Sequence, residues 1–314
     1  MKVLVVCSGT RGTLTPFIKE QMDALSNLGV EFSLFQIKKG GLIGYLFHLN
    51  SLQKKIRQFK PDLIHAHYGL SGLLANLQRS VPVVTTFHGS DINEANVYRY
   101  SKVAHHLSSA SIFVGKSIMQ KIKKHAFSVI IPCGVNTSVF HSDFKEAAAK
   151  KMGINTNDLN ILFSSSFNIP VKNYELAKTS CSILETKINS KINLIELKGY
   201  CRDDVNLLLN ACDSVLLTSF SEGSPQIIKE AMACSCPIVT TNVGDVKWML
   251  GNTSGSFITS FEPEDVTEKL KLAIEFRKEI GNTNGRQRLI ELGLDSETVG
   301  LKILKVYKKV LDVN

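Results

Sequence analysis

Short apolar runs alternate along the chain with longer stretches in which apolar residues recur at every third or fourth position. The short runs predict buried strands, and the longer stretches predict helices with one apolar face. In the first part of the chain the predicted strands cover residues 3–7, 31–36, 62–67, 81–87, 111–114 and 129–131. Thr15 and Pro16 are typical of a helix start, and Gly29 is typical of a helix end. This alternation predicts a parallel sheet with helices on both faces.

A second series of the same kind follows a turn-forming segment at residues 132–136. Its predicted strands cover residues 159–163, 192–197, 213–218, 237–241 and 256–258. We therefore expect an α/β protein of two Rossmann-like, doubly wound domains facing each other across a cleft, with residues 1–137 in the first and 138–296 in the second. The last pattern predicts a helix over residues 297–311, whose apolar face is formed by Leu301, Leu304, Tyr307, Val310 and Leu311.

The composition is that of a soluble globular protein. The chain has 314 residues, of which 44% are hydrophobic and 21% are charged, so it is long enough for two domains. The apolar run at the amino terminus is too short for a signal peptide. No run approaches the roughly 20 apolar residues that a membrane-spanning helix needs. These features predict a cytoplasmic protein.

The cysteines and histidines do not form a recognisable metal pattern. The seven cysteines are scattered, mostly within apolar runs, so buried reduced thiols are expected. Cys234 and Cys236 are separated by one residue, which is poor spacing for zinc. His65 and His67 share one face of a predicted strand, but no third ligand is apparent. We therefore expect neither a metal nor a cofactor.

Positive charge is concentrated in the first part of the chain. Residues 1–137 carry 16 Lys and Arg against 6 Asp and Glu, a net charge of +10, whereas the rest carries 21 against 22. This imbalance favours an anionic partner. No basic motif interleaved with aromatic residues is present, so nucleic acid is not expected, and anionic lipid or an acidic acceptor is favoured.

One basic segment in this part has two interpretations. Its basic residues surround the apolar residues 42–47 and are Lys38, Lys39, Lys54, Lys55, Arg57 and Lys60. The segment is either an interfacial helix that lies on an anionic membrane or an ordinary helix with a solvated basic face. Residues 99–125 add further positive charge. Peripheral contact with the inner face of the cell membrane is one of the expectations.

The most informative stretch is residues 221–233. An apolar run leads into a turn with Gly223 and Pro225, a helical stretch follows, and a second apolar run leads out. The start of such a helix presents backbone N–H groups to phosphate oxygens. Glu222 before the turn and Glu230 on the helix would repel phosphate unless they bound sugar hydroxyls, so the pattern indicates a nucleotide-sugar site. The alternative is two solvated charges at an ordinary helix start.

Four segments in order resemble the signature of family 4 retaining glycosyltransferases. Glu222 and Glu230 lie in a Ser-x-x-Glu-Gly-x-Pro…Lys-Glu-Ala-Met-Ala pattern, and residues 85–91 resemble the family's His-Gly-x-Asp loop. Residues 132–140 resemble its interdomain Pro-Asn-Gly-Val-Asp…Phe segment. Lys172 stands where the family has the lysine that holds the diphosphate. The resemblance spans nearly the whole chain.

The resemblance implies a GT-B fold, in which the second domain binds a nucleoside-diphosphate sugar and the first binds a glycan or lipid-linked acceptor. Residues 297–314 would cross back to the first domain. The implied activity is metal-independent transfer with retention of configuration, with bacterial surface polysaccharide as the expected product. The implied catalytic residues are His88, Lys172 and Glu222. The implied donor-binding residues are Gly223, Ser224, Pro225, Gln226, Ile227 and Glu230, with N–H donors at positions 224, 226 and 227, since proline has none.

Further candidates and departures remain. A loop with Gly9, Arg11 and Gly12 follows the first strand and is expected to face the donor. The family usually has Arg at the position of Phe167, so one phosphate-binding guanidinium is missing, and Arg11 is a candidate to replace it. Asp91 is either an acceptor-side residue or a loop cap, and His88 could instead be structural.

Two other functions are compatible with this sequence. The chain could be a non-catalytic nucleotide-sugar or glycan-binding subunit that supports another transferase, which the missing arginine motivates. It could also be an NAD-type dehydrogenase, because it has two Rossmann-like halves.

Overall fold

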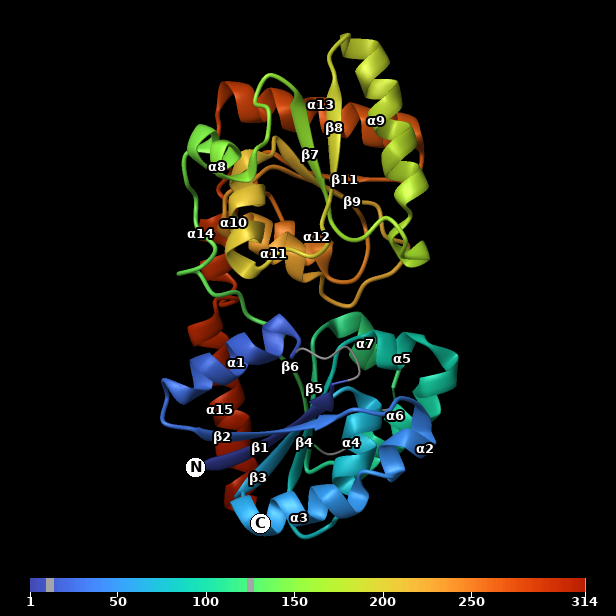
Figure 1. Cartoon of the computed structure of the whole chain (residues 1–314), viewed down its shortest axis with the longest axis vertical. Helices are drawn as coiled ribbons and strands as arrows, with labels where there is room; N and C mark the ends of the chain where they lie inside the picture. The colour runs from blue at the N-terminus through green and yellow to red at the C-terminus, as the bar shows by residue number, and fades with distance from the viewer. Residues whose placement is uncertain (10–13, 123–126, 314) are drawn as a thin grey trace. The chain divides into compact units, whose positions relative to one another are not determined.

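The computed structural model describes residues 1–9, 14–122 and 127–313. The chain forms two compact units, of which unit 1 comprises Met1–Gly134 and Ser296–Asn314 and unit 2 comprises Val135–Asp295. Each unit contains one parallel sheet (Figure 1). The boundary between the units follows Gly134, whereas the sequence predicts it after residue 137.

Unit 1 contains a six-stranded sheet in the order β2-β1-β3-β4-β5-β6, in which all neighbouring pairs are parallel. The strands are β1 (Lys2–Ser8), β2 (Glu31–Ile37), β3 (Leu63–His67), β4 (Val83–Phe87), β5 (Ala110–Phe113) and β6 (Ser128–Ile130). Successive side chains of β1 point to opposite faces of the sheet, since Val3 packs into one apolar cluster and Leu4 into another. Both faces of the sheet are therefore buried, as a parallel sheet requires.

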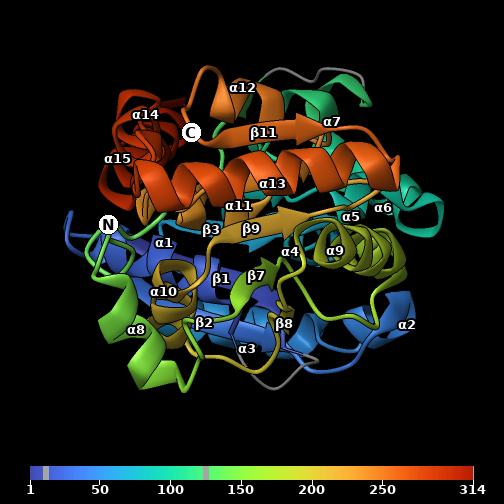
Figure 2. The same cartoon turned by 90° about the horizontal axis from the view of Figure 1, so that it is seen from above.

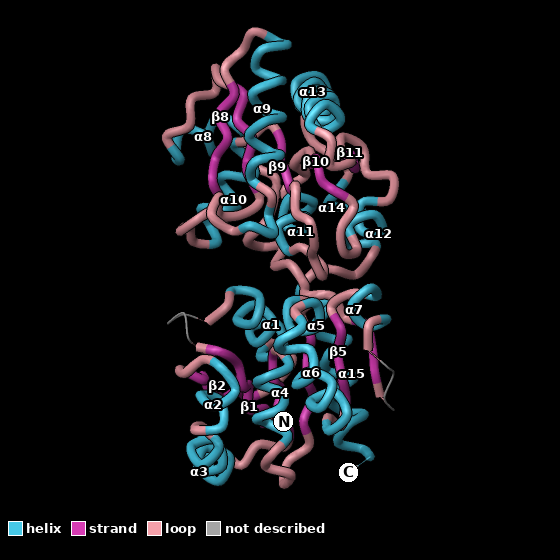
Figure 3. The backbone as a smooth tube through the Cα atoms, turned by 90° about the vertical axis from the view of Figure 1, so that its right-hand side faces the viewer, coloured by secondary structure: helices cyan, strands magenta, loops and turns pink. Residues whose placement is uncertain are grey.

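Helices cover both faces of this sheet. They are α1 (Pro16–Ser26), α2 (Gly41–Leu46), α3 (Leu49–Phe59), α4 (Gly69–Asn76), α5 (Ser90–Asn93), α6 (Ala95–Leu107), α7 (Lys116–Gln120) and α15 (Ser296–Val313). Side chains of α2, α3 and α4 pack with Leu4, and α1 and α15 pack with Val3. Figure 3 shows α4 beside α6, which it contacts. The sheet is thus held between two helical layers.

The last helix, α15, belongs to unit 1, as predicted. Figure 1 shows it beside α1, which it contacts. Its predicted apolar face is correct for Tyr307 and Val310 and wrong for Leu301, which is 47% exposed. The residues that α15 buries are Val299, Gly300, Ile303, Val306, Tyr307 and Val310. Leu304 and Leu311 are partly buried and pack against the same core, so the predicted face is wrong at Leu301 alone and omits Val299, Ile303 and Val306.

Unit 2 contains a five-stranded parallel sheet in the order β11-β10-β9-β7-β8. The strands are β7 (Leu159–Phe163), β8 (Ile192–Glu196), β9 (Ser214–Leu217), β10 (Ile238–Thr241) and β11 (Ser256–Thr259). The helical segments are α8 (Lys145–Met152), η1 (Pro170–Lys172), α9 (Tyr174–Ile188), α10 (Arg202–Ala211), α11 (Gln226–Ala233), α12 (Val246–Leu250), α13 (Pro263–Glu279) and α14 (Gly285–Glu291). Figure 2 shows α13 running alongside β9 and β11, and α13 shares an apolar cluster with strands of this sheet.

All predicted strands are present, and their ends differ from the prediction by no more than two residues. This confirms the predicted fold class of two doubly wound sheets. Among the described helices, none combines the length and the apolar character needed to cross a membrane.

Candidate active site

The described candidate residues follow the carboxyl ends of parallel strands or begin the next helix, which is where α/β sheets bind ligands. In unit 2 they follow β7 and β9. In unit 1 they follow β1 and β4. Gly9 is described, and its N–H donates to the Ile37 carbonyl over 2.8 Å. Arg11 and Gly12 lie outside the described residues.

The segment between β9 and α11, here called the donor turn (residues 218–225), is tied to the segment that carries Lys172. The Thr218 hydroxyl donates to the carbonyls of Lys172 and Asn173, over 2.9 Å in both cases. The Phe220 N–H donates to the Val171 carbonyl over 2.9 Å. These bonds fix the backbone of Lys172 against the donor turn.

Lys172 and Glu222, which the sequence analysis proposes as catalytic residues, are brought together. The Lys172 ammonium lies 2.5 Å from Oε1 of Glu222. The Ser219 hydroxyl donates to the same oxygen over 2.7 Å. Both charged side chains are largely buried but keep some exposure to solvent. The pair therefore places a cation and a carboxylate at one accessible point of the turn.

The start of α11 carries the other predicted donor-binding positions. Pro225 is the N-cap residue, and Gln226 and Ile227 begin the helix. A neighbouring loop supports the turn at Gly244, where φ is +60° and a Cβ atom would lie 2.5 Å from the Gly223 carbonyl oxygen. Only glycine fits this close approach. The positive end of α11 is thus held against the loop that follows β10.

Glu230 lies in the second turn of α11 and is 3% exposed. Its Oε1 lies 2.7 Å from Nη2 of Arg202, the first residue of α10. The Arg202 guanidinium also lies over the Phe140 ring, 4.4 Å from its centroid. This pairing is not predictable from the sequence, because the two residues are 28 positions apart and belong to different helices.

A second buried cation supports the donor turn and was also missed. Lys229 is fully buried, and its ammonium donates to the Ser224 hydroxyl over 3.2 Å. Burial raises the pKa of Asp245, and the positive charge of Lys229 opposes that shift. A helical position flanked by Ile228 and Glu230 gives no sequence signal that its lysine is buried.

In unit 1, His88 follows β4 and is surrounded by rings. Its Nε2 lies 3.0 Å from Nδ1 of His67, and its Nδ1 lies 3.8 Å from Sγ of Cys133. The rings of Phe17 and Tyr68 lie 4.8 and 4.5 Å from the His88 ring. Tyr68 has a φ of +71°, which is strained for a non-glycine residue. Such strain is typical of functional sites.

Asp91 holds the loop that carries His88. Its Oδ1 accepts the N–H groups of His88 and Gly89 over 3.1 and 2.9 Å, and its Oδ2 accepts that of Gly69 over 3.0 Å. Burial raises its pKa to about 6, against the effect of these hydrogen bonds. The bonds support the loop-cap interpretation, and a contact between Asp91 and an acceptor stays a prediction.

Beneath His88, the paired histidines of β3 are buried. His65 hydrogen-bonds to the hydroxyls of Tyr307 and Thr86 over 2.6 and 2.7 Å. Burial lowers the pKa of His67 to about 3, and burial also lowers the pKa of His65. Both are therefore neutral at physiological pH. Within residues 1–9, 14–122 and 127–313, no three His, Cys, Asp or Glu side chains gather as a metal site would require.

Two family models match the chain, and together they span most of it. The model described as Glycosyltransferase Family 4 matches residues 1–139, and the model described as Glycosyl transferases group 1 matches residues 174–275. The chain belongs to the family 4 glycosyltransferases.

Individual proteins agree with this assignment. An uncharacterized glycosyltransferase of Methanocaldococcus jannaschii is 27% identical over 88% of this chain and 84% of its own length. A putative teichuronic acid biosynthesis glycosyltransferase of Bacillus subtilis is 29% identical over 63% of this chain and 57% of its own length. The crystal structure of HepE from Anabaena with UDP-glucose has a TM-score of 0.73 and 16% identity, and covers 98% of this chain and 100% of that one. The fold is that of GT-B glycosyltransferases.

Phe167 stands where the resemblance to the family predicts an arginine, and the structure shows where this side chain lies. The Phe167 ring stacks on Tyr174 with centroids 4.1 Å apart and lies 5.5 Å from Phe163. It joins the apolar cluster between β7 and α9. The ring is partly buried and packs against the core, and this position contributes no charge to the site.

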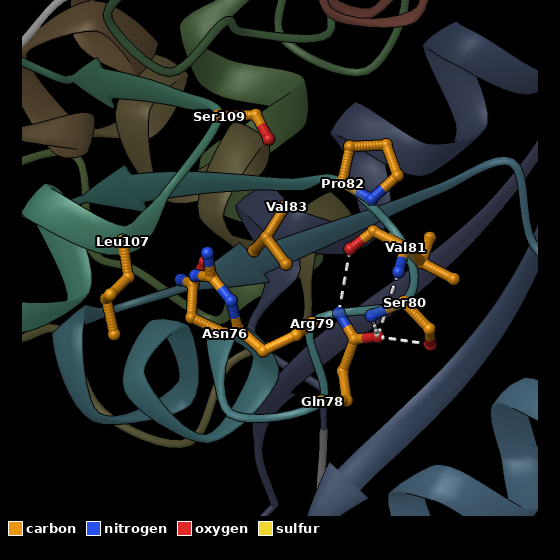
Figure 4. Close-up of a pocket in the computed structure, with 9 residues that line it drawn as sticks. All are labelled: Asn76, Gln78, Arg79, Ser80, Val81, Pro82, Val83, Leu107 and Ser109. Atoms are coloured by element: carbon orange, nitrogen blue, oxygen red, sulfur yellow. Dashed lines mark hydrogen bonds between the residues drawn. The ribbon is translucent and has the colours of Figure 1, made fainter. Parts of the chain in front are cut away.

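The glycosyltransferase also has a polar hollow of about 250 Å³ in unit 1 (Figure 4). It is lined by Asn76, Gln78, Arg79, Ser80, Val81, Pro82, Val83, Leu107 and Ser109. Gln78 organises its rim, since its amide donates to the Val81 carbonyl over 2.7 Å and accepts the Ser80 N–H over 2.8 Å. The hollow lies at the amino end of β4, whereas His88 follows the carboxyl end, so the two are separate.

Proposed function

We propose that this glycosyltransferase moves a sugar from a nucleoside-diphosphate sugar to a glycan or lipid-linked acceptor, with retention of configuration and without a metal ion. The main support for this proposal is the Lys172–Glu222 pair beside the start of α11, with Glu230 in the second turn of that helix. A diphosphate, its sugar and its ribose need a cation, backbone N–H groups and a carboxylate at neighbouring positions.

Two relatives support the substrate class. HepE was solved with UDP-glucose, and the Bacillus subtilis relative is named for teichuronic acid biosynthesis. We therefore propose a role in the synthesis of a bacterial surface polysaccharide. The four ordered sequence motifs support retention, because they resemble those of the retaining family.

The proposed chemistry begins as the bond between the anomeric carbon and the diphosphate breaks. Negative charge then develops on the phosphate oxygens, and Lys172 together with the positive end of α11 would stabilise it. Diphosphate binding would replace Glu222 as the partner of the Lys172 ammonium, because a phosphate oxygen is a strong acceptor. The Glu222 carboxylate would then accept a hydroxyl of the sugar. The N–H groups of Ser224, Gln226 and Ile227 are the proposed phosphate donors.

Unit 1 is proposed to bind the acceptor, and His88 to contact the transferred sugar. The ring of His88 is held by its contact with His67 over 3.0 Å and by the loop that Asp91 caps. A sugar hydroxyl would therefore meet a fixed imidazole, which favours a single orientation of the sugar.

We also propose that unit 1 makes peripheral contact with an anionic membrane through α2. Ile43 and Phe47 are 71% and 70% exposed, and Leu46 is exposed beside them. Lys39 lies over the Phe47 ring, with its ammonium 5.3 Å from the ring centroid. Exposed apolar side chains flanked by cations are typical of interfacial helices. Sedimentation with vesicles tests this, since Phe47→Ser should weaken binding to anionic vesicles and leave thermal stability unchanged.

The central experiment compares Lys172→Ala with Lys178→Ala. Lys178 is an exposed lysine of α9, so its removal controls for the loss of one positive charge. We expect Lys172→Ala to lower sugar transfer from the donor at least a hundredfold, and Lys178→Ala to lower it less than twofold. Transfer at wild-type rate by Lys172→Ala would refute the proposed site. Proton NMR of the product tests retention, and activity in excess EDTA tests metal independence.

A non-catalytic role in support of another transferase is the second candidate. The packing of Phe167 against Tyr174 favours it, because an apolar ring then stands where the family resemblance predicts a phosphate-binding cation. Transfer or donor hydrolysis by the purified chain alone would exclude this role.

A further inference from the structure

Under the proposed function the carboxylate of Glu230 binds the ribose hydroxyls of the donor, and this carboxylate already has a partner within the protein. Oε1 of Glu230 lies 2.7 Å from Nη2 of Arg202, and the carboxylate side chain is 4% exposed. A carboxylate this deeply buried costs several kcal/mol unless a positive charge or hydrogen bonds compensate it. Arg202 supplies that charge.

The guanidinium is itself held in place by its surroundings. It lies 4.4 Å from the centroid of the Phe140 ring, a geometry that favours a cation over an aromatic face. Phe140 is fully buried in the core of unit 2, so the ring has little freedom to move. Arg202 begins α10, and the helix start is fixed because the Cys201 N–H donates to Asp204 over 3.2 Å.

We propose that Arg202 is a positioning residue that orients Glu230 toward the ribose of the donor. This inference rests on the proposed function. The guanidinium engages Oε1 of the carboxylate, so Oε2 is the oxygen that accepts the ribose hydroxyls. Arg202 then strengthens binding only of nucleotides that carry the 2′- and 3′-hydroxyls, because its effect passes through Glu230.

The experiment measures dissociation constants by calorimetry for the full chain and four variants, Arg202→Gln, Arg202→Lys, Glu230→Gln and the Arg202→Gln/Glu230→Gln double variant. The probes are UDP, GDP and ADP, and the tightest of them is compared with its 2′,3′-dideoxy analogue. Lys198→Gln is the matched control, because Lys198 is an exposed cation in the connection that leads to α10.

We expect Arg202→Gln to weaken binding of the ribonucleotide at least tenfold and binding of the dideoxy analogue less than twofold. Arg202→Lys should be intermediate, because an ammonium keeps the charge but lacks the planar fork. The dissociation constant of the double variant should lie within twofold of that of Glu230→Gln, because the two substitutions remove the same interaction. Lys198→Gln should bind both ligands as the wild type does.

Other outcomes separate the two proposals. Equal weakening of both ligands by Arg202→Gln would indicate a structural role and overturn the positioning role. Weakening by Glu230→Gln but not by Arg202→Gln or Arg202→Lys would overturn the positioning role and leave the proposed function intact. A wild-type chain that binds none of the three nucleotides would overturn both. If Arg202→Gln does not fold, Arg202→Lys decides between these outcomes.

Discussion

The loop that carries His88 should depend on a single carboxylate. Asp91 is 5% exposed, and it accepts the backbone N–H groups of Gly69, His88 and Gly89. Asp91→Ala leaves all three donors without an acceptor. At about 1–3 kcal/mol for each buried unpaired group, and with water recovering part of the loss, we expect a decrease of about 3–6 kcal/mol in the free energy of unfolding of unit 1.

Asp91→Asn provides a finer test, because it keeps one acceptor oxygen and replaces the other by an amide. Only the Gly69 N–H then loses its acceptor, so the free energy of unfolding should fall by about 2 kcal/mol at pH 4. The pKa of Asp91 is raised to about 6 in the folded chain from the ordinary 3.8. Wild-type stability therefore falls as pH rises from 3.8 to 6, by up to about 3 kcal/mol. Asparagine does not titrate, so the penalty of Asp91→Asn should shrink toward pH 7.

Urea denaturation followed by circular dichroism, with each variant compared with the wild type at the same pH, measures these differences. The single tryptophan, Trp248, lies in unit 2, so its fluorescence reports the unfolding of the other unit. Asp62→Asn is the control, because this exposed carboxylate accepts one backbone N–H, from Lys2 over 2.7 Å. It should change stability by no more than about 0.5 kcal/mol.

Two results would refute this reasoning. A loss below about 1 kcal/mol for Asp91→Ala would mean that the three N–H groups find other partners. A penalty for Asp91→Asn that grows between pH 4 and pH 7 would mean that the charged carboxylate is favoured by the fold. Hydrogen exchange at the amides of Gly69, His88 and Gly89 should accelerate in Asp91→Ala if the loop opens locally.

Three further predictions concern other parts of the chain. Gly244→Ala should weaken nucleotide binding at least tenfold, because its Cβ would lie 2.5 Å from a carbonyl oxygen of the donor turn, whereas Gly153→Ala, at φ +66° in open space, should not. Tyr307→Phe removes a buried hydrogen bond of 2.6 Å and should lower the free energy of unfolding by about 1–2 kcal/mol in urea denaturation; an unchanged midpoint would contradict this. The pKa of His67 is lowered to about 3 in the folded chain, so below pH 6.5 the unfolded chain binds more protons than the folded chain. His67 alone should therefore lower the free energy of unfolding by about 2 kcal/mol between neutral pH and pH 5. His67→Gln should reduce that acid sensitivity, and the exposed control His106→Gln should not.

The strands and the donor turn could be predicted because their signals are local. Apolar runs bounded by turn residues define each strand, and Glu222 and Glu230 stand at fixed positions around one turn. The pairing of Arg202 with Glu230 could not be predicted, because it joins two helices and no local pattern records which helices are neighbours.

The predicted face of α15 is wrong at Leu301 and omits Ile303 and Val306, for a related reason. The apolar residues of this helix cover a broad face, so periodicity alone does not show which of them lie at its centre. The sheet of unit 1 decides this, because Ile303 and Val306 pack into the cluster that contains Val3, whereas Leu301 is exposed.

The position of α15 has a consequence for the order in which the two units fold. Unit 2 is encoded by one uninterrupted stretch, whereas unit 1 needs the final residues of the chain, which supply Tyr307 and its buried neighbours. Unit 2 can therefore complete its core from one contiguous segment, whereas unit 1 first has to recover α15. A chain truncated before residue 296 should resist protease in unit 2 and be cleaved in unit 1, although unit 1 is the first to be synthesised.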